Sequence, residues 1–164
     1  MSSLQKINSK IVTQKEATLK ANQWKKDGLS IVFTNGCFDL IHLGHIDYLS
    51  KASDLGHKLI IGVNTDNSVS KLKGKHRPIK DEVSRATILA ALNFVDLVIL
   101  FSEDTPINLI TSLSPNVLVK GADYSINEVV GAKETIQNGG KVKLIKFLDG
   151  YSTSLIESKI RNHT

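Results

Sequence analysis

Short apolar runs alternate with helical patterns along the whole chain. The runs at residues 31–33 and 59–63 are rich in β-branched side chains and lack polar alternation, as expected of strands covered on both faces. Further strands are predicted at 95–101, 117–119 and 142–145. Because strands and helices alternate, we predict an α/β fold in which helices cover both faces of an open parallel sheet.

Helix boundaries are marked by capping residues and glycines. Thr13 and Glu16 form a capping box that opens an N-terminal helix, and Gly28 can close that helix in the left-handed conformation. We further expect a helix around Ile46 that ends at Gly56, a polar loop over 64–80 and a helix over 82–92. Another helix should start at Thr105, with Pro106 at its first position. A capping box from Ser154 to Glu157 should open a terminal helix that reaches about Arg161.

The chain has 164 residues and shows no repeat or low-complexity linker. We therefore expect one Rossmann-like domain over 30–164, preceded by a helical arm over 1–29 that serves packing or a subunit contact. In such sheets, ligands bind beyond the carboxyl ends of the strands, where the strand order reverses. The loops after Phe33, Val63, Val119 and Ile145 are accordingly the places to look for a site.

Composition narrows the class of partner. Hydrophobic residues make up 41% and charged residues 23%, as in ordinary globular proteins, and no apolar run approaches the ~20 residues of a membrane span. Cys37 is the single cysteine, so no internal disulfide can form and a cytoplasmic location is expected. The net charge of +5 favours anionic partners, while aromatics at 5% argue against a nucleic-acid surface. We expect a small anionic ligand, with neither nucleic acid nor membrane as partner.

The most informative loop spans 34–45. Gly36 allows a sharp turn and a close backbone approach to a ligand, and the helix that follows would direct free N–H groups at an anion. His42 and His45 are three residues apart, so they share a face and can both donate to phosphate oxygens, while Gly44 leaves room between them. The Gly-Lys-Ser/Thr ending of a P-loop is missing from this loop.

Two other interpretations of the histidines are open. With Cys37 as third ligand, His42 and His45 could bind zinc, but a fourth ligand is not evident, and the remaining histidines show no matching spacing. These are His57, His76 and His163. Alternatively, both side chains could simply face solvent at the end of a helix.

The segment 34–45 as a whole resembles the signature of the cytidylyltransferase-like nucleotidyltransferases. That signature is a His-x-Gly-His that follows a strand and a Gly-x-Phe-Asp turn. Residues 36–39 and 42–45 supply the two parts. Within that family, residues from about 30 to 160 are most similar to the branch that makes ADP-heptose for surface polysaccharide. The ordered motifs are 34–39, 72–74 with 77–78, 103–106, 119–124, 133–134, 138–140, and 149–150 with 152–154. The cytidylyl branch carries an Arg-Thr before its Gly-x-Ser-Thr-Thr segment, whereas this chain has Phe147, Leu148 and Asp149 there, which favours the heptose branch.

The resemblance implies transfer of AMP from ATP to D-glycero-β-D-manno-heptose 1-phosphate, by direct in-line attack that releases pyrophosphate. It also implies Mg²⁺ held through the triphosphate, without a metal site made by the protein, and a homo-oligomer, most simply a dimer. Three alternatives remain: nucleotidyl transfer to another small phosphate such as glycerol 3-phosphate, a nucleotide-binding module without turnover, and a basic RNA-binding domain.

The same resemblance assigns the residues. His42, His45 and Lys73 are the expected catalytic groups, acting on the triphosphate. ATP is expected to contact Thr34, Asn35, Gly36, Cys37, Phe38, Gly44, Arg85, Lys120, Gly121, Asp123, Ser152 and Thr153. The sugar phosphate is expected to contact Asp39, Asn64, Asp66 and Arg77.

Three of these residues also have a plainer interpretation. Lys73 could belong to a solvated charged loop, and Arg85 could form a surface salt bridge on its helix. Asp123 could hold the ribose or only stabilise a turn.

Overall fold

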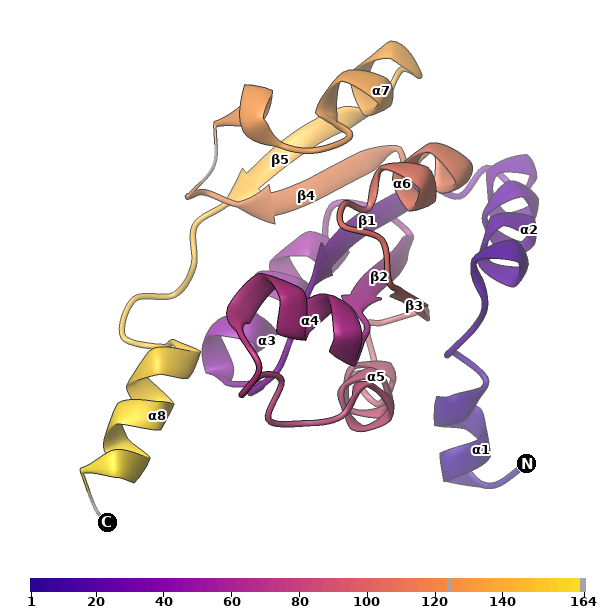
Figure 1. Cartoon of the computed structure of the whole chain (residues 1–164). Coiled ribbons are helices and arrows are strands. Elements are labelled where there is room, and N and C mark those ends of the chain that lie inside the picture. Colours follow the sequence, from indigo (N-terminus) through magenta and orange to yellow (C-terminus); the bar gives the residue numbers. More distant parts are fainter. Residues whose placement is uncertain (124, 163–164) are drawn as a thin grey trace.

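Five parallel strands form one sheet in the order β3-β2-β1-β4-β5 (Figure 1). The structure, a computed structural model, describes residues 1–123 and 125–162. The strands are β1 (Ile31–Gly36), β2 (Lys58–Asn64), β3 (Leu97–Phe101), β4 (Val117–Gly121) and β5 (Lys141–Ile145). The predicted α/β class and parallel sheet are confirmed. The chain fills one half of the sheet outward from β1 and then crosses over to β4, so the strand order reverses between β1 and β4.

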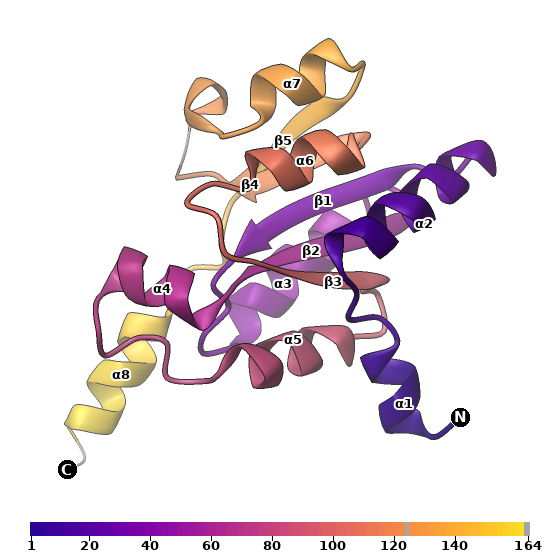
Figure 2. The ribbon, with the colours of Figure 1, turned by 45° about the vertical axis from the view of Figure 1, so that its right-hand side comes forward.

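Helices cover both faces of this sheet (Figure 2). They are α1 (Ser3–Asn8), α2 (Gln14–Lys26), α3 (Leu43–Ser53), α4 (Asp66–Lys73), α5 (Glu82–Ala90), α6 (Ile107–Leu113), α7 (Ala132–Gln137) and α8 (Thr153–Arg161), with a short 3₁₀ turn η1 (Ile126–Glu128) before α7. One core contains side chains of α3 and α5, and the other contains side chains of α2, α6 and α7.

The strands are apolar without alternation because each face meets one of these cores. Val32 packs in the core of α3 and α5, whereas its neighbours Ile31 and Phe33 pack in the core of α2 and α6. Val32, Phe33 and their β2 partners Leu59 and Ile60 are at most 2% exposed, which fixes the register of the two central strands.

The N-terminal arm packs onto the rest of the chain. Thr13 caps α2 and forms the predicted capping box with Glu16. Ala17 and Ala21 of α2 are fully buried in the core next to α6. Before α2, the extended backbone around Ile11 runs alongside β3 and exchanges two hydrogen bonds with it, one in each direction.

Three expected boundaries were wrong. The segment expected as loop over 64–80 contains α4, since the Thr65 hydroxyl accepts from the Ser68 N–H and caps a helix there. Pro106 precedes α6 as its N-cap residue, so Thr105 is not the cap. In α8 the cap is Ser152, whose Oγ accepts from the Leu155 N–H, rather than Ser154 two residues later.

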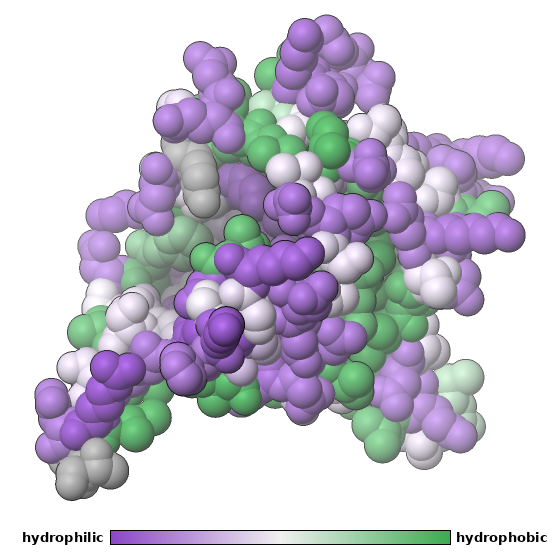
Figure 3. Space-filling view, in the orientation of Figure 1, coloured by the Kyte–Doolittle hydropathy of each residue, from purple (hydrophilic) through white to green (hydrophobic). Residues whose placement is uncertain are grey.

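Helix α8 lies apart from the sheet and its covering helices, at the lower left of Figures 1 and 2. It follows a loop over 146–152 that leaves the carboxyl end of β5. The space-filling view shows this end of the chain projecting from the body of the molecule (Figure 3). In the described part of the chain, no helix has both the length and the apolarity needed to cross a membrane.

Candidate active site

Three adjoining cavities lie beyond the carboxyl ends of β1 and β4, where the strand order reverses. An inner cavity of about 490 Å³ is lined by Asn35, Cys37, Tyr48, Lys120, Gly121 and others. An outer cavity of about 500 Å³ is lined by His42, Leu148, Gly150, Tyr151, Ser152 and others. A basic cavity of about 590 Å³ is lined by His76, Arg77, Ser154, Glu157, Arg161 and others.

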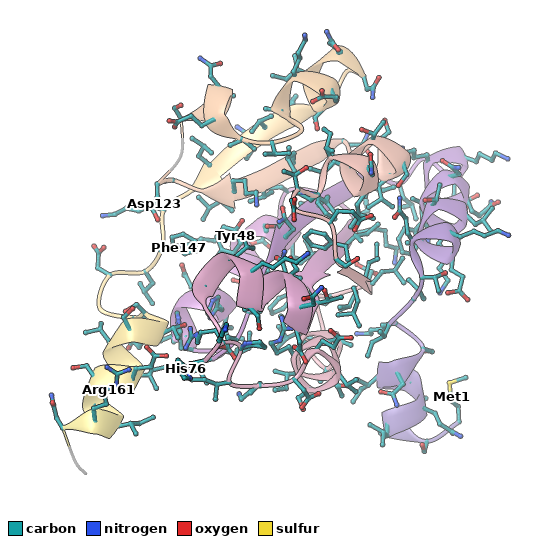
Figure 4. All side chains as sticks on the ribbon, in the orientation of Figure 1. Met1, Tyr48, His76, Asp123, Phe147 and Arg161 are labelled. Carbon is teal, nitrogen blue, oxygen red and sulfur yellow. The ribbon has the colours of Figure 1, made fainter. Side chains whose placement is uncertain are left out.

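A few residues belong to more than one cavity and so mark where the cavities meet. Thr153, the first residue of α8, lines all three. His45, Asp123 and Phe147 line both the inner and the outer cavity, and Lys73 lines both the inner and the basic one. Figure 4 labels Tyr48, Asp123 and Phe147 close together at this end of the sheet.

The two motif histidines stand at the start of α3. His42 is its N-cap residue, and the ring centroids of His42 and His45 are 4.0 Å apart. The His42 N–H approaches Nδ1 of His45 at 3.4 Å. A neutral His45 then carries its proton on Nε2, where it is available to a ligand. A Cβ on Gly44 would lie 3.0 Å from the His42 ring, so glycine leaves room for that ring.

Burial sets the charge state of this pair. It lowers the pKa of His42, and burial together with nearby His42 and Lys73 lowers the pKa of His45 to about 4. Near pH 7 both imidazoles are therefore neutral hydrogen-bond donors in the free protein. Nδ1 of His42 is buried and has no hydrogen-bond partner within the described ranges.

Two lysines reach the cavities from different sides. Lys73 ends α4 and is exposed. Lys120 is the next-to-last residue of β4, and its Nζ donates to the backbone oxygen of Asn35 over a long 3.4 Å. Burial lowers the pKa of Lys120 to about 8.

Arg85 of α5 is fully buried and holds several segments together. Its guanidinium donates to the backbone oxygen of Lys80 at 3.0 Å, to that of Cys37 at 2.6 Å, and to Oδ1 of Asp66 at 2.7 Å. The surface salt bridge considered from the sequence is therefore wrong for Arg85. Arg85 instead supports the loop that carries Cys37 through its hydrogen bond to the Cys37 backbone oxygen.

Asp39 and Arg77 are joined to each other. The buried Asp39 carboxylate accepts from the N–H groups of Ile79 and Lys80 at 2.9 Å and pairs with Nε of Arg77 at 3.2 Å. Arg77 also pairs with Glu157 of α8. These bonds fasten the 77–80 segment to the first loop and to α8.

Other sequence-predicted residues form the floor of the site. The Asn64 amide is buried, donating to Oγ of Ser68 at 2.9 Å and receiving the Cys37 thiol at 3.9 Å. The buried Thr34 hydroxyl is 2.8 Å from the Tyr48 hydroxyl. The side chains of Asn64 and Thr34 thus contact protein groups beneath the cleft.

Sequence reasoning missed the aromatic residues of the cleft. Tyr48 and Phe147 have ring centroids 5.1 Å apart, and burial raises the pKa of Tyr48 to about 12. The Phe147 ring also lies against Gly121, where a Cβ would come within 2.2 Å of it. The available signal was that Phe147 lies in the segment where the cytidylyl branch carries Arg-Thr. Tyr124, in the expected nucleotide loop, and His163, weighed as a metal ligand, lie outside the described residues.

The described residues contain no cluster of three or more His, Cys, Asp or Glu side chains placed to hold a metal ion. Besides the carboxylates of Asp39, Asp123, Asp149 and Glu157, the cleft offers cationic and neutral donors: lysines, imidazoles and hydroxyls. Such a set suits phosphate groups.

Fold and site together define a nucleotide-binding α/β domain, and comparison with known proteins gives the family. Residues 33–159 match the cytidylyltransferase-like family. The chain is 56% identical over 133 residues to the bifunctional protein HldE of Citrifermentans bemidjiense. This match covers 81% of this chain and 27% of the relative. It is 50% identical over 147 residues to HldE of Rhodospirillum rubrum, covering 90% of this chain and 30% of the relative.

Two solved structures share the fold. A lipopolysaccharide core biosynthesis protein from Thermoplasma volcanium is 31% identical, with a TM-score of 0.60 over 76% of this chain and 100% of that protein. Pantoate-β-alanine ligase from Francisella tularensis, at 16% identity, has a TM-score of 0.60 over 92% of this chain and 76% of its own, and shares the fold.

The chain therefore belongs to the cytidylyltransferase-like family and is a nucleotidyltransferase. It spans about a third of the length of the curated relatives it matches.

Proposed function

We propose that the protein transfers AMP from ATP to D-glycero-β-D-manno-heptose 1-phosphate, giving ADP-heptose and pyrophosphate. The observation that carries the transfer chemistry is the neutral His42 and His45 pair, since His45 lines the inner and outer cavities together with Thr153, the residue common to all three. The ordered motifs of the heptose branch, without the Arg-Thr of the cytidylyl branch, support the choice of substrates.

The layout of the cavities suits a reaction with three parts. A nucleotidyl transfer needs space for the nucleoside, for the leaving pyrophosphate and for the attacking acceptor, all meeting at the α-phosphorus. Thr153 and His45 stand where such spaces meet. We assign the nucleoside to the outer cavity and the pyrophosphate to the basic cavity, which contains Lys73 and His76.

The acceptor phosphate attacks the α-phosphorus directly, so the protein need not supply a nucleophile. Its contribution is to align the reactants and to stabilise the charge that builds on the phosphate oxygens. His42 and His45 donate hydrogen bonds to the triphosphate, and Lys73 adds a positive charge near the α-phosphate. Arg85 acts from behind, as a positioning residue that holds the Cys37 backbone through its 2.6 Å bond.

Mg²⁺ fits this cleft as a partner of the nucleotide. Asp39 is occupied by N–H groups and Arg77, which leaves Asp123 as the carboxylate lining both the inner and the outer cavity. An ion held mainly by phosphate oxygens and water needs few such ligands. It would neutralise charge on the triphosphate.

Pyrophosphate release tests the substrates. ATP and CTP are each paired with the heptose 1-phosphate, mannose 1-phosphate and glycerol 3-phosphate, and kcat/KM is compared. A site that hydrogen-bonds several hydroxyls can reject an acceptor lacking them by as much as ~10⁴, so ATP with the heptose phosphate should dominate. If CTP with glycerol 3-phosphate is the best pair, the heptose assignment is lost.

We also propose that the enzyme works in the cytoplasm as a homodimer. The free, half-buried Cys37 thiol fits a reducing compartment. Light scattering on the purified protein measures the oligomer directly, and a monomeric mass at assay concentration would remove the dimer.

A further inference from the structure

The ammonium of Lys120 is a largely buried positive charge without a carboxylate partner. Among the described residues, none of the ion pairs within 4.0 Å involves Lys120. Its hydrogen bond to the Asn35 backbone oxygen, at 3.4 Å, is long and weak. Burying a charge without compensation is costly, so such a group in a cavity favours an anionic ligand.

The inner cavity around Lys120 offers no buried carboxylate that is free to pair with it, and only the nearby Cys37 thiol opposes the effect of burial on the pKa of Lys120. Its other titratable side chains are Cys37, Asp39, His45, Tyr48, Lys73 and Asp123. The Asp39 carboxylate already accepts two backbone N–H groups and pairs with Arg77. Asp123 is exposed to solvent.

A second group in this cavity lacks a hydrogen-bond partner. Asn35 lines the cavity, and its Oδ1 is buried and unpaired within the described ranges. A buried acceptor oxygen favours a ligand that brings a hydroxyl or N–H donor. A cation that needs an anion, next to an acceptor that needs a donor, matches a phosphate ester bearing hydroxyl groups.

We propose that Lys120 binds the phosphate of the acceptor substrate and that the inner cavity is the acceptor site. This rests on the proposed function only in taking the acceptor to be a phosphate monoester. The assignment differs from the sequence-based expectation, which grouped Lys120 with the nucleotide. Phe147 separates the two sides, since its ring packs on Gly121 and Tyr48 while lining both the inner and the outer cavity.

The position of Lys120 suits in-line attack. The attacking oxygen must approach the α-phosphorus from the side opposite the leaving pyrophosphate. The inner cavity meets the basic cavity at Lys73 and Thr153. An acceptor held at Lys120 on one side would face the pyrophosphate across the α-phosphorus between them.

The proposal has a pH signature. A bound phosphate dianion favours charged Lys120, whereas the free protein loses that proton above about pH 8. Acceptor binding should therefore weaken as the pH rises through 8, with KM increasing about tenfold per pH unit beyond it. The acceptor's own second pKa is about 6, so it does not contribute above pH 7.5. His45 at about 4 and Tyr48 at about 12 also lie outside this range.

The test measures KM for both substrates in Lys120→Gln, using whichever acceptor phosphate the wild-type enzyme turns over best. We expect KM for the acceptor to rise about 10- to 100-fold and KM for ATP to change less than about threefold, as for loss of one charge-assisted hydrogen bond. Lys143→Gln, on the exposed face of β5, makes the same change of charge away from the cavities and should leave both constants near wild type.

The wild-type pH profile provides a test that needs no variant to fold. KM for the acceptor should bend upward near pH 8 in the wild type and stay flat in Lys120→Gln. The same bend should persist in Cys37→Ser, which excludes thiol titration. A flat wild-type profile between pH 7.5 and 9.5, or a rise confined to KM for ATP in Lys120→Gln, overturns the proposal. If glycerol 3-phosphate replaces the heptose phosphate as best acceptor, the substrate assignment fails while the Lys120 test proceeds unchanged.

Discussion

Replacing Arg85 by methionine should lower the free energy of unfolding. It should remove no direct contact with substrate. The change keeps an unbranched side chain but removes the donors to the Lys80 and Cys37 carbonyls and to Asp66. The Asp66 side chain is 41% exposed, so water can solvate its carboxylate when Arg85 is replaced. The lost bond between Asp66 and Arg85 therefore contributes little to the destabilisation. The two carbonyls lose charge-assisted bonds of about 1.5–3 kcal/mol each, and we expect a total of about 3–5 kcal/mol.

Urea unfolding and thermal melting measure this loss. For a chain of this size, the expected change corresponds to a melting temperature lower by about 6–20 °C. Asp66→Asn is the matched control, and it should cost less than Arg85→Met because both carbonyl bonds and an acceptor oxygen for the guanidinium remain. If Arg85→Met unfolds like the wild type, the bonds to the Lys80 and Cys37 carbonyls do not stabilise the fold, and the positioning role is refuted.

Three further predictions concern the cleft. His45→Ala should lower kcat by about 10²–10³ with the fold intact, since its donor acts mainly as charge develops; near-normal turnover would end its catalytic assignment. Lys73→Ala should lower kcat more than it raises KM for ATP, whereas Lys75→Ala should be almost silent; equal effects would mean that only the general charge of the segment matters. Gly121→Ala should displace the Phe147 ring, which lies 2.2 Å from the added Cβ, and raise KM for both substrates; unchanged kinetics would show that the ring position is unimportant.

Much of the fold could be predicted because it depends on local patterns. The apolar runs at 31–33 and 59–63 were recognisable as buried strands, and the capping box of Thr13 and Glu16 marked the start of α2. The cap of α4 at Thr65 was harder, because a charged, exposed helix with few apolar residues looks like a loop. The short α7, with glycines on both sides, gave no periodic signal long enough to detect.

The site was predictable in outline and not in detail. Strand ends and the spacing of the two histidines located the cleft, since both follow from neighbours in sequence. The partners of Asp39 could not be foreseen, because Ile79 and Lys80 lie some forty residues away and bond to it through backbone N–H groups. The sequence shows which polar side chains are near the site, but only the packed chain shows which of them contact other protein groups.

The two outer strands of the sheet are shielded from edge-to-edge association by different means. β3 is covered by the chain's own extended backbone, in which the Val12 N–H donates to Val98 and the Lys10 oxygen accepts from it. β5 instead exposes Lys141 and Lys143, whose charges discourage pairing with another strand. A chain shortened to begin after Val12 would keep the cleft residues but leave β3 an open strand, and would therefore be more prone to aggregate than the full chain.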